Sequence, residues 1–488
     1  MKRSCGILLH LSSLPSPHGI GTMGKAAFEF IDFLSGAKQG FWQMLPVSPT
    51  SFADSPYQSV STFAGNPYFI DLDILVNEGL LLPEELNADW GDDPRKVDYG
   101  KLYLNRGRVL RLAFSRFDRN EMEDFVRENA AWLDGYSLFA ACKEYFSGLP
   151  WHSWDDEIKF RTPEGLEKYR TLLAEDIAYH RFVQYEFDKQ WSALRAYAKG
   201  KGVKLIGDVP IYVPWDSADV WERPELYLLD EELKPVLVAG VPPDYFSKTG
   251  QLWGNPLYDW DAHEREGFAW WLFRMGAAKR RFDVARIDHF RGLESFWAVP
   301  FAEETAVNGS WLKGPGMKLV SAIKREHPDL TVIAEDLGFL TPEVNKLLSD
   351  SGFWGMRVLQ FGFDPYKNSR ELPHNYPLNC VAYTGTHDNS TMMGWASATE
   401  PKYLGFAVQY LGLNREEGFP FGFARGVLCS CAKLAIIPMQ DYLGLGDEAR
   451  MNLPGSTGWW TYRMGADDCD EKLQSRIASY SRMTGRAD

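Results

Sequence analysis

Apolar runs rich in β-branched residues alternate with helical patterns along most of the chain. Each run is short enough to form one buried strand, and the stretches between runs place apolar side chains at helical spacing. This alternation is typical of βα units, in which a helix follows each parallel strand and packs against it. We predict eight strands, near residues 5–11, 41–47, 203–213, 284–290, 331–336, 356–363, 379–386 and 435–442.

Two helices between these runs have well-defined apolar faces. The helix after the first strand carries Ala27, Phe30, Ile31 and Leu34 on one side. The helix before the third strand carries Phe187, Trp191, Leu194 and Ala198, and Gly200 and Gly202 follow it. Later in the chain, Thr341 and Pro342 are typical of an N-cap and a first helical position. Eight strands joined by helices predict an α/β fold, a (β/α)8 TIM-type barrel.

Insertions must account for much of the length. A chain of 488 residues could form several domains, but α/β barrels often run long through insertions in their loops. We therefore expect residues 1–488 to form a single catalytic barrel without a separate C-terminal β-domain. The main insertion, about 48–200, should be a helical subdomain between strands two and three. Smaller insertions, about 214–283 and 291–330, should lie near the mouth of the barrel.

Three of the predicted strands end in a carboxylate-bearing segment: Val284-Ala-Arg-Ile-Asp288, Val332-Ile-Ala-Glu335 and Tyr383-Thr-Gly-Thr-His387-Asp388. The carboxyl ends of barrel strands all open onto one face, so these acids can meet in one cleft. Paired carboxylates flanking a bond are the machinery of glycosidic cleavage. An acid at a strand end can also cap the next helix or pair with a nearby base. Three such acids together favour the catalytic interpretation.

The surroundings of two of these acids suit different roles. Arg286 precedes Asp288 by two positions on the same strand face, and its positive charge favours the ionised form that a nucleophile needs. Glu335 follows a strand that is apolar on both faces, so desolvation should raise its pKa toward the range of an acid catalyst. We interpret the neighbouring Asp336 as structural, and His10 and His289 as structural or supporting residues.

Composition excludes several classes of partner. The formal charge of −14 and the absence of a Lys/Arg-rich block argue against nucleic acid and favour a neutral substrate. No apolar run approaches the ~18 residues that span a bilayer, so we expect no membrane association. The first strand begins almost at once, without a signal segment. Six scattered cysteines form no disulfide framework, and Cys429-x-Cys431 lacks a partner pair, so we expect a cytoplasmic protein without a structural metal.

One motif could indicate a cofactor. Gly19, Gly21 and Gly24 fit the G-x-G-x-x-G pattern of dinucleotide-binding folds and open a helix. Pro15 and Pro17, however, separate these glycines from the strand, where a dinucleotide-binding turn is tight. The second strand also ends without an acidic ribose ligand. We therefore interpret the glycines as turn formers at the rim of the barrel and expect no cofactor.

Segments spread over nearly the whole chain resemble one enzyme family. They are Gly6-Ile-Leu-Leu-His10-Leu-Ser-Ser-Leu-Pro15, Asp54-Ser-Pro-Tyr57, Gly65-Asn-Pro-Tyr68, Gly207-Asp208-Val-Pro-Ile-Tyr-Val213, Val241-Pro-Pro-Asp244-Tyr-Phe-Ser, Thr249-Gly-Gln251-Leu-Trp253-Gly-Asn-Pro256 and the three acid-bearing strands. With these segments the chain resembles the 4-α-glucanotransferases of the amylomaltase, or disproportionating enzyme, family. The segment Met451–Trp460 departs somewhat from the family pattern around its tryptophans.

The resemblance implies roles for individual residues. Asp288 would be the nucleophile, Glu335 the acid/base, and Asp388 the residue that grips sugar hydroxyls and strains the ring. Residues 241–256 would form a loop over the cleft, in effect a lid. Residues in contact with glucan would be Ser55, Tyr57, Asp208, Asp244, Gln251, Trp253, Arg286, Phe361 and His387.

Residue chemistry independently supports a lid at 241–256. Pro242 and Pro243 stiffen one end of this segment, and Gly250 and Gly254 loosen the other. The alternative is an insertion that merely packs on the barrel.

The expected reaction is transfer of part of an α-1,4-glucan to the 4-hydroxyl of an acceptor glucan or glucose, with retention through a covalent glycosyl-enzyme. Maltooligosaccharides would serve as donor and acceptor. An α-1,4-glucan hydrolase would need the same carboxylates, because only the acceptor differs. A glucan-binding protein without activity is disfavoured because all three acids are present. We expect a monomer or a weak homo-oligomer.

Overall fold

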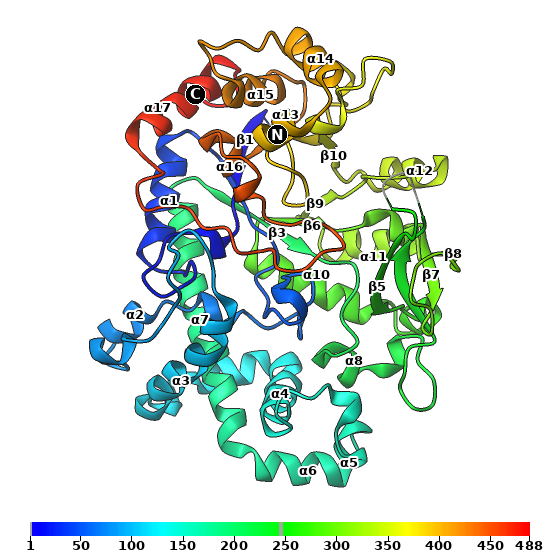
Figure 1. Cartoon of the computed structure of the whole chain (residues 1–488). Helices are drawn as coiled ribbons and strands as arrows, with labels where there is room; N and C mark the ends of the chain where they lie inside the picture. The colour runs from blue at the N-terminus through cyan, green and yellow to red at the C-terminus, as the bar shows by residue number, and fades with distance from the viewer. Residues whose placement is uncertain (1, 244–246) are drawn as a thin grey trace.

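The computed structural model of the chain, which describes residues 2–243 and 247–488, is built around one parallel sheet of eight strands (Figure 1). Its strands are β1 (Ser4–Leu8), β2 (Phe41–Gln43), β3 (Lys204–Val209), β6 (Val284–Ile287), β9 (Thr331–Ala334), β10 (Gly355–Val358), β11 (Cys380–Tyr383) and β12 (Leu434–Pro438). All eight coincide with predicted runs. The predicted runs extend beyond the strands because buried apolar residues such as Ile211 and Val213 continue into the loop after β3.

The strands are ordered β10-β11-β12-β1-β2-β3-β6-β9. Strand β1 lies between β12 and β2, so the first and last strands of the chain pair with each other. The outermost strands, β9 and β10, approach each other through one bridge between Ile333 and Trp354. There the Trp354 amide donates to the Val332 carbonyl at 3.0 Å and the Ala334 amide donates to the Trp354 carbonyl at 2.8 Å. The sheet is therefore a nearly closed barrel, which confirms the predicted fold class.

Helices surround the barrel. They are α1 (Lys25–Gly36), α2 (Leu72–Asn77), α3 (Tyr99–Arg116), α4 (Glu123–Tyr145), α5 (Asp156–Lys159), α6 (Pro163–Leu172), α7 (Ala174–Gly200), α8 (Ala218–Glu222), α9 (Trp260–Arg265), α10 (Ala269–Arg281), α11 (Met317–Glu326), α12 (Pro342–Ser351), α13 (Met392–Ala398), α14 (Pro401–Leu411), α15 (Phe419–Leu428), α16 (Met439–Leu443) and α17 (Glu471–Met483). The predicted faces of α1 and α7 are buried. Helix α12 begins as predicted, with the Thr341 hydroxyl accepting from the Val344 amide.

The chain between β2 and β3 folds into helices and loops, from α2 to α7. In Figure 1 the cyan helices α4, α5 and α6 lie at the end of the molecule away from the strands, and the long helix α7 leads back toward β3. These helices occupy the region of the main predicted insertion. Its status as a subdomain stays a prediction.

A second sheet, which sequence patterns did not predict, has four antiparallel strands in the order β5-β4-β7-β8. They are β4 (Leu237–Val241), β5 (Gln251–Pro256), β7 (Ser295–Pro300) and β8 (Ser310–Lys313). Strands β4 and β5 come from the insertion before β6, and β7 and β8 from the insertion after it. Residues 251–256 therefore form a strand, and the expectation of a loop over all of 241–256 is wrong for this part. Pairing with β4 supplies the hydrogen bonds that turn the segment into a hairpin.

Two glycines of the motif lie where the backbone or the packing favours glycine. Gly19 has φ +81°, a conformation that favours glycine, and Gly24 is the N-cap of α1. A Cβ on Gly24 would collide with the Asp71 carboxylate, so close packing also requires glycine here. Across the described part of the chain, no helix is long and apolar enough to cross a membrane.

Candidate active site

The strand-end acids lie at one end of the barrel because all eight strands run in the same direction. Asp208 is near the end of β3, Asp288 directly follows β6, and Glu335 directly follows β9. These three strands are neighbours in the sheet. The Asp288 amide donates to the Val209 carbonyl at 3.0 Å, and the Glu335 amide donates to the Ile287 carbonyl at 3.0 Å. The main chain therefore holds three acids from distant sequence positions side by side.

Arg286 joins two of these acids. Its Nη1 donates to Asp208 Oδ2 at 2.6 Å, and its Nη2 lies 2.9 Å from Asp288 Oδ1. Tyr57 donates its hydroxyl to the same Asp208 oxygen at 2.9 Å. The side chains of Arg286 and Asp208 are buried, whereas the Asp288 side chain is 28% exposed. Asp288 is thus the carboxylate of this group that solvent or a substrate can reach.

The charge of Arg286 is secure despite its burial. Burial alone would lower the pKa of Arg286, but Asp208 and Asp288 together raise it well above its ordinary value. The guanidinium beside Asp288 therefore keeps its positive charge. The expected ion pair between Arg286 and Asp288 is therefore present, and Asp208 extends it.

Glu335 has different surroundings. Its Oε1 accepts from the Leu337 amide at 2.9 Å, and its Oε2 accepts from the His289 amide at 2.8 Å. Burial raises the pKa of Glu335 to about 7, and the negative charge of Asp288 adds to this effect. The direction is the one that its apolar strand indicates. A carboxyl group with a pKa near neutrality can hold a proton and release it at ordinary pH.

His289 contributes to the site in a way that sequence reasoning missed. It adopts φ +48°, in the left-handed region that residues other than glycine rarely occupy. The amide of this strained residue reaches the Glu335 carboxyl group. Such backbone strain is concentrated at functional sites, where the surrounding structure maintains it. The available signal was the position of His289 directly after Asp288.

Asp388 lies in the loop after β11 and contacts the C-terminal part of the chain. Asn452 donates its side-chain N–H to Asp388 Oδ1 at 2.6 Å, and His387 Nε2 lies 3.4 Å from the same oxygen. Arg450 Nη2 donates to the Asp388 carbonyl at 2.7 Å. Arg450 and Asn452 were also missed, because nothing in their local sequence points to an acid so far away.

Aromatic rings line the site between these acids. The Tyr57 ring stacks on the His387 ring with a centroid distance of 5.2 Å and an interplanar angle of 15°. Trp460 packs against both rings, at 5.9 Å from Tyr57 and 6.0 Å from His387. Burial lowers the pKa of His387, so its neutral form is favoured. Tyr57 therefore bridges the Asp208 side of the site and the Asp388 side.

The remaining predicted residues surround this group less directly. Trp253, on β5, lies edge-on to the His289 ring at 4.8 Å and donates its Nε1–H to Gln251 Oε1 at 3.2 Å. Ser55 precedes Tyr57 in a loop, and its hydroxyl accepts from the Tyr57 amide at 3.2 Å. Phe361 follows β10 in the short helix η9 (Leu359–Phe361) and is 51% exposed. Asp244 lies outside the described residues.

Within residues 2–243 and 247–488, no group of three or more histidine, cysteine or acidic side chains is placed to hold a metal ion. What the geometry does offer is a carboxylate paired with arginine, Asp288, beside a carboxyl group that titrates near neutrality, Glu335. One nucleophilic and one protonatable carboxyl group are the requirements of glycosyl transfer with retention.

Comparisons with known proteins point to one enzyme family. A family model described as 4-alpha-glucanotransferase, glycoside hydrolase family 77, matches residues 9–467. A 4-alpha-glucanotransferase of Clostridium butyricum is 47% identical over 98% of this chain and 100% of its own length. A 4-alpha-glucanotransferase of Thermus thermophilus is 44% identical over 100% of this chain and 99% of its own.

Solved structures show the same fold. An amylomaltase from Streptococcus agalactiae, in complex with acarbose, covers 100% of both chains with 40% identity and a TM-score of 0.97. An amylomaltase from Corynebacterium glutamicum shares the fold at 19% identity, covering 98% of this chain and 75% of its own, with a TM-score of 0.78. This chain therefore belongs to the 4-alpha-glucanotransferases of glycoside hydrolase family 77, the amylomaltases.

Proposed function

We propose that this 4-alpha-glucanotransferase moves a segment of an α-1,4-glucan to the 4-hydroxyl of an acceptor glucan or glucose by double displacement. Configuration at the anomeric carbon would be retained because each of the two steps inverts it. The observation that carries this proposal is the contrast between the two neighbouring acids. Asp288 is paired with a charged arginine at 2.9 Å, whereas burial raises the pKa of Glu335 to about 7.

In the first step the protonated Glu335 gives its proton to the glycosidic oxygen. An Asp288 carboxylate oxygen bonds to the anomeric carbon, and the bond from that carbon to the leaving oxygen breaks. Arg286, itself bonded to Asp208, would hold the Asp288 carboxylate in position. Asp388 would bind sugar hydroxyls beside this bond and strain the ring toward the transition state.

In the second step the ionised Glu335 takes the proton of the acceptor's 4-hydroxyl. That oxygen bonds to the anomeric carbon while the bond to Asp288 breaks, so both acids return to their starting states. The stacked rings of Tyr57 and His387 would contact the sugar bound at the cleavage point. Gln251, Trp253, Ser55, Phe361 and Asp244 would complete the glucan-binding surface.

The segment 241–256 would control which acceptor reacts. The Trp253 ring contacts the His289 ring, and the main-chain amide of His289 donates to the Glu335 carboxyl group. This hairpin therefore lies next to the acid/base. A lid here would exclude water from the covalent intermediate until a sugar acceptor binds. The helical insertion about 48–200 would form one side of the glucan path, since it contributes Ser55 and Tyr57. The complex of the Streptococcus agalactiae amylomaltase with acarbose supports a saccharide ligand for this chain.

Incubation of the protein with maltotriose alone tests the proposal. Transfer predicts a ladder of longer glucans together with free glucose, and a constant number of reducing ends. Glucose and maltose without longer products would instead show an α-1,4-glucan hydrolase on the same scaffold. Unchanged maltotriose would contradict both enzymatic readings.

A further inference from the structure

The barrel has a seam between β9 and β10 where the main-chain ladder is incomplete. Alternate N–H groups of a strand point to the same neighbour, so the amides of Trp354, Met356 and Val358 all face this seam. Trp354 donates to a main-chain carbonyl of β9, that of Val332, at 3.0 Å. The next two amides bond to side chains instead. Met356 donates to Asp336 Oδ1 at 2.5 Å, and Val358 donates to Glu371 Oε2 at 2.8 Å.

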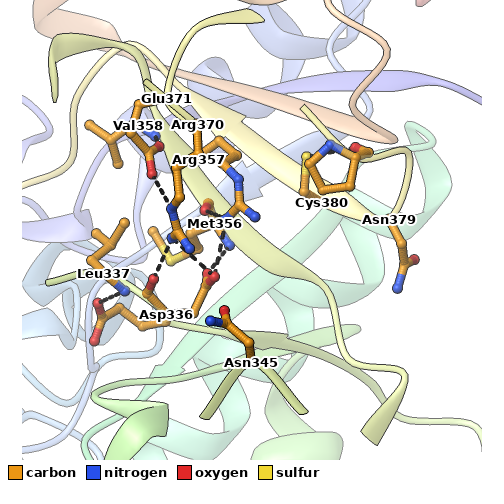
Figure 2. A network of polar contacts seen from close by, with 12 residues as sticks. Asp336, Leu337, Asn345, Met356, Arg357, Val358, Arg370, Glu371, Asn379 and Cys380 are labelled. Carbon is orange, nitrogen blue, oxygen red and sulfur yellow. Dashed lines mark hydrogen bonds and ion pairs between the residues drawn. The ribbon is translucent and has the colours of Figure 1, made fainter. Parts of the chain in front are cut away.

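Two arginines bond to Asp336, and one of them, Arg370, also bonds to Glu371 (Figure 2). Arg357 Nη1 donates to Asp336 Oδ2 at 3.0 Å, and Arg370 Nη2 donates to the Asp336 carbonyl at 2.8 Å. Arg370 Nε also donates to Glu371 Oε1 at 2.7 Å. Asp336 is 1% exposed, and each of its side-chain oxygens has a partner. A buried carboxylate this fully paired holds the seam in place. Loss of its charge would leave Arg357 without its ion-pair partner, while Arg370 would still pair with Glu371.

The packing around Asp336 is specific. A Cβ on Gly355 would lie only 3.0 Å from Asp336 Oδ1, so glycine leaves room for the carboxylate at the start of β10. Directly after Asp336 in the sequence, the Leu337 amide donates to Glu335 Oε1 at 2.9 Å. The turn that Asp336 anchors therefore supplies one of the two amides that hold the Glu335 carboxyl group.

We propose that Asp336 is a positioning residue for Glu335: its carboxylate replaces the missing ladder at the seam and fixes the turn from which the acid/base projects. This inference rests on the proposed role of Glu335. Glu371 closes the same seam one amide further on, but it bonds to Val358 and Arg370 and not to the turn 335–337. A substitution of Glu371 is therefore the matched control, because it disturbs the seam without removing a bond to the turn that holds Glu335.

Charge provides a second link between the two residues. The charged groups that face Glu335 are Asp288 and Arg286 from β6 and Asp336 from its own segment, and burial keeps the His289 ring neutral by lowering its pKa to about 4. The negative charge of Asp336 raises the pKa of Glu335. Neutralising Asp336 would remove this effect and the ion pair of Arg357, whereas Arg370 would keep its ion pair with Glu371. The pKa of Glu335 would then fall.

The test compares Asp336→Asn with the wild-type enzyme on two donors, maltotriose and α-maltosyl fluoride. Fluoride is a leaving group that needs little protonation, so its release does not depend on a well-placed acid. We expect turnover of maltotriose to fall by about tenfold or more, while fluoride release falls by less than about threefold. The alkaline limb of the kcat/KM profile with maltotriose should also move to lower pH. A role in folding alone would lower both rates together and leave this limb in place.

Two further variants make the result decisive. Glu371→Gln should lower thermal stability without changing the ratio of the two rates. Arg370→Gln keeps the bond between Asp336 and Met356 and removes a partly exposed side chain, so this variant should fold even if Asp336→Asn does not. It should shift the ratio of maltotriose turnover to fluoride release in the same direction as Asp336→Asn.

Equal losses on both donors with an unmoved alkaline limb, or a change in ratio for Glu371→Gln as large as that for Asp336→Asn, would overturn the proposal. Glu335→Gln separates the two levels of inference. If Glu335→Gln does not favour the fluoride donor, the role of Glu335 itself is wrong. If Glu335→Gln favours the fluoride donor but Asp336→Asn and Arg370→Gln do not, the role of Glu335 stands and only the positioning role of Asp336 is wrong.

Discussion

The side-chain amide of Asn452 donates to Oδ1 of Asp388 across 2.6 Å, although 64 positions separate the two residues in the sequence. Asn452 also donates its main-chain amide to the His387 carbonyl at 3.0 Å. The segment before α17 is thereby connected at two points to the loop that carries one of the three acids. The orientation of Asp388 depends on a part of the chain that contributes no barrel strand.

Replacement of Asn452 by alanine should lower kcat/KM for maltotriose by about fivefold to tenfold, because a hydrogen bond to a charged group contributes about 1.5–3 kcal/mol and the 41% exposure of the Asp388 side chain reduces this. Asn308→Ala is a matched control. Its side chain also donates to a carboxylate, Glu303 Oε2 at 3.0 Å, but in the connection between β7 and β8. Similar activity losses in both variants would contradict a specific role for Asn452.

Asp288→Asn should lower turnover by about a thousandfold or more while glucan binding and folding persist, since removal of a nucleophile eliminates a bond that forms only during the reaction. Arg286 retains Asp208 as its counter-ion, so the neutral side chain should not disrupt the site. Activity measurements beside isothermal titration with a maltooligosaccharide check this expectation. Substantial turnover, with reversion of asparagine to aspartate excluded by mass spectrometry, would show that another residue is the nucleophile.

Glu335→Gln should abolish cleavage of maltotriose but spare the first step with a glycosyl fluoride. The glycosyl-enzyme should then accumulate, because no base remains to activate the acceptor. Intact-protein mass spectrometry can detect the adduct. Glu343→Gln, at an exposed position in the first turn of α12, is the matched control and should behave as wild type. Fluoride release impaired as strongly as maltotriose cleavage would exclude Glu335 as the acid.

The pH dependence of kcat/KM for maltotriose should have an alkaline limb near pH 7. The first step needs the protonated form of Glu335, and burial raises the pKa of this residue to about 7. Protonated acid, and with it the rate, is therefore present below that value and is lost as the pH rises through it. With α-maltosyl fluoride the limb should weaken or vanish. A limb that is identical for both donors would assign the titration to a different group.

Trp253→Ala should lower the total rate and raise the ratio of hydrolysis to transfer. The loss of one stacking contact is worth roughly 1–3 kcal/mol by analogy with aromatic–base stacking, which is about tenfold or more in the choice of acceptor. Transfer conserves reducing ends and hydrolysis adds one per event, so a reducing-end assay beside product analysis gives the ratio. Trp311→Ala, a 41% exposed tryptophan on β8 of the same sheet, should leave the ratio unchanged. An unaltered ratio in Trp253→Ala would mean that this hairpin does not control the acceptor.

Local pattern determined the barrel. Buried parallel strands need continuous apolar runs, and amphipathic helices need a repeating apolar face, so both leave a signature within a few residues of sequence. The acids could be found from the sequence because Asp288 and Glu335 directly follow their strands. In a parallel barrel the carboxyl ends of all strands lie on the same face, so these two acids are expected to lie close together. Asp208 and Arg286 are register partners in the parallel pair of β3 and β6, so the pairing of the two strands places them side by side.

Tertiary structure decided the features that depend on which distant segments meet. The second sheet forms because β4 and β7 pair across two insertions separated by β6, and each insertion alone shows only a short apolar run. The left-handed conformation of His289 and the bond between Asn452 and Asp388 likewise have no local signature. At the seam, Asp336 bonds to Met356 only because the ladder between β9 and β10 ends after one bridge. Side-chain hydrogen bonds between remote residues follow from three-dimensional proximity, which periodicity along the chain does not encode.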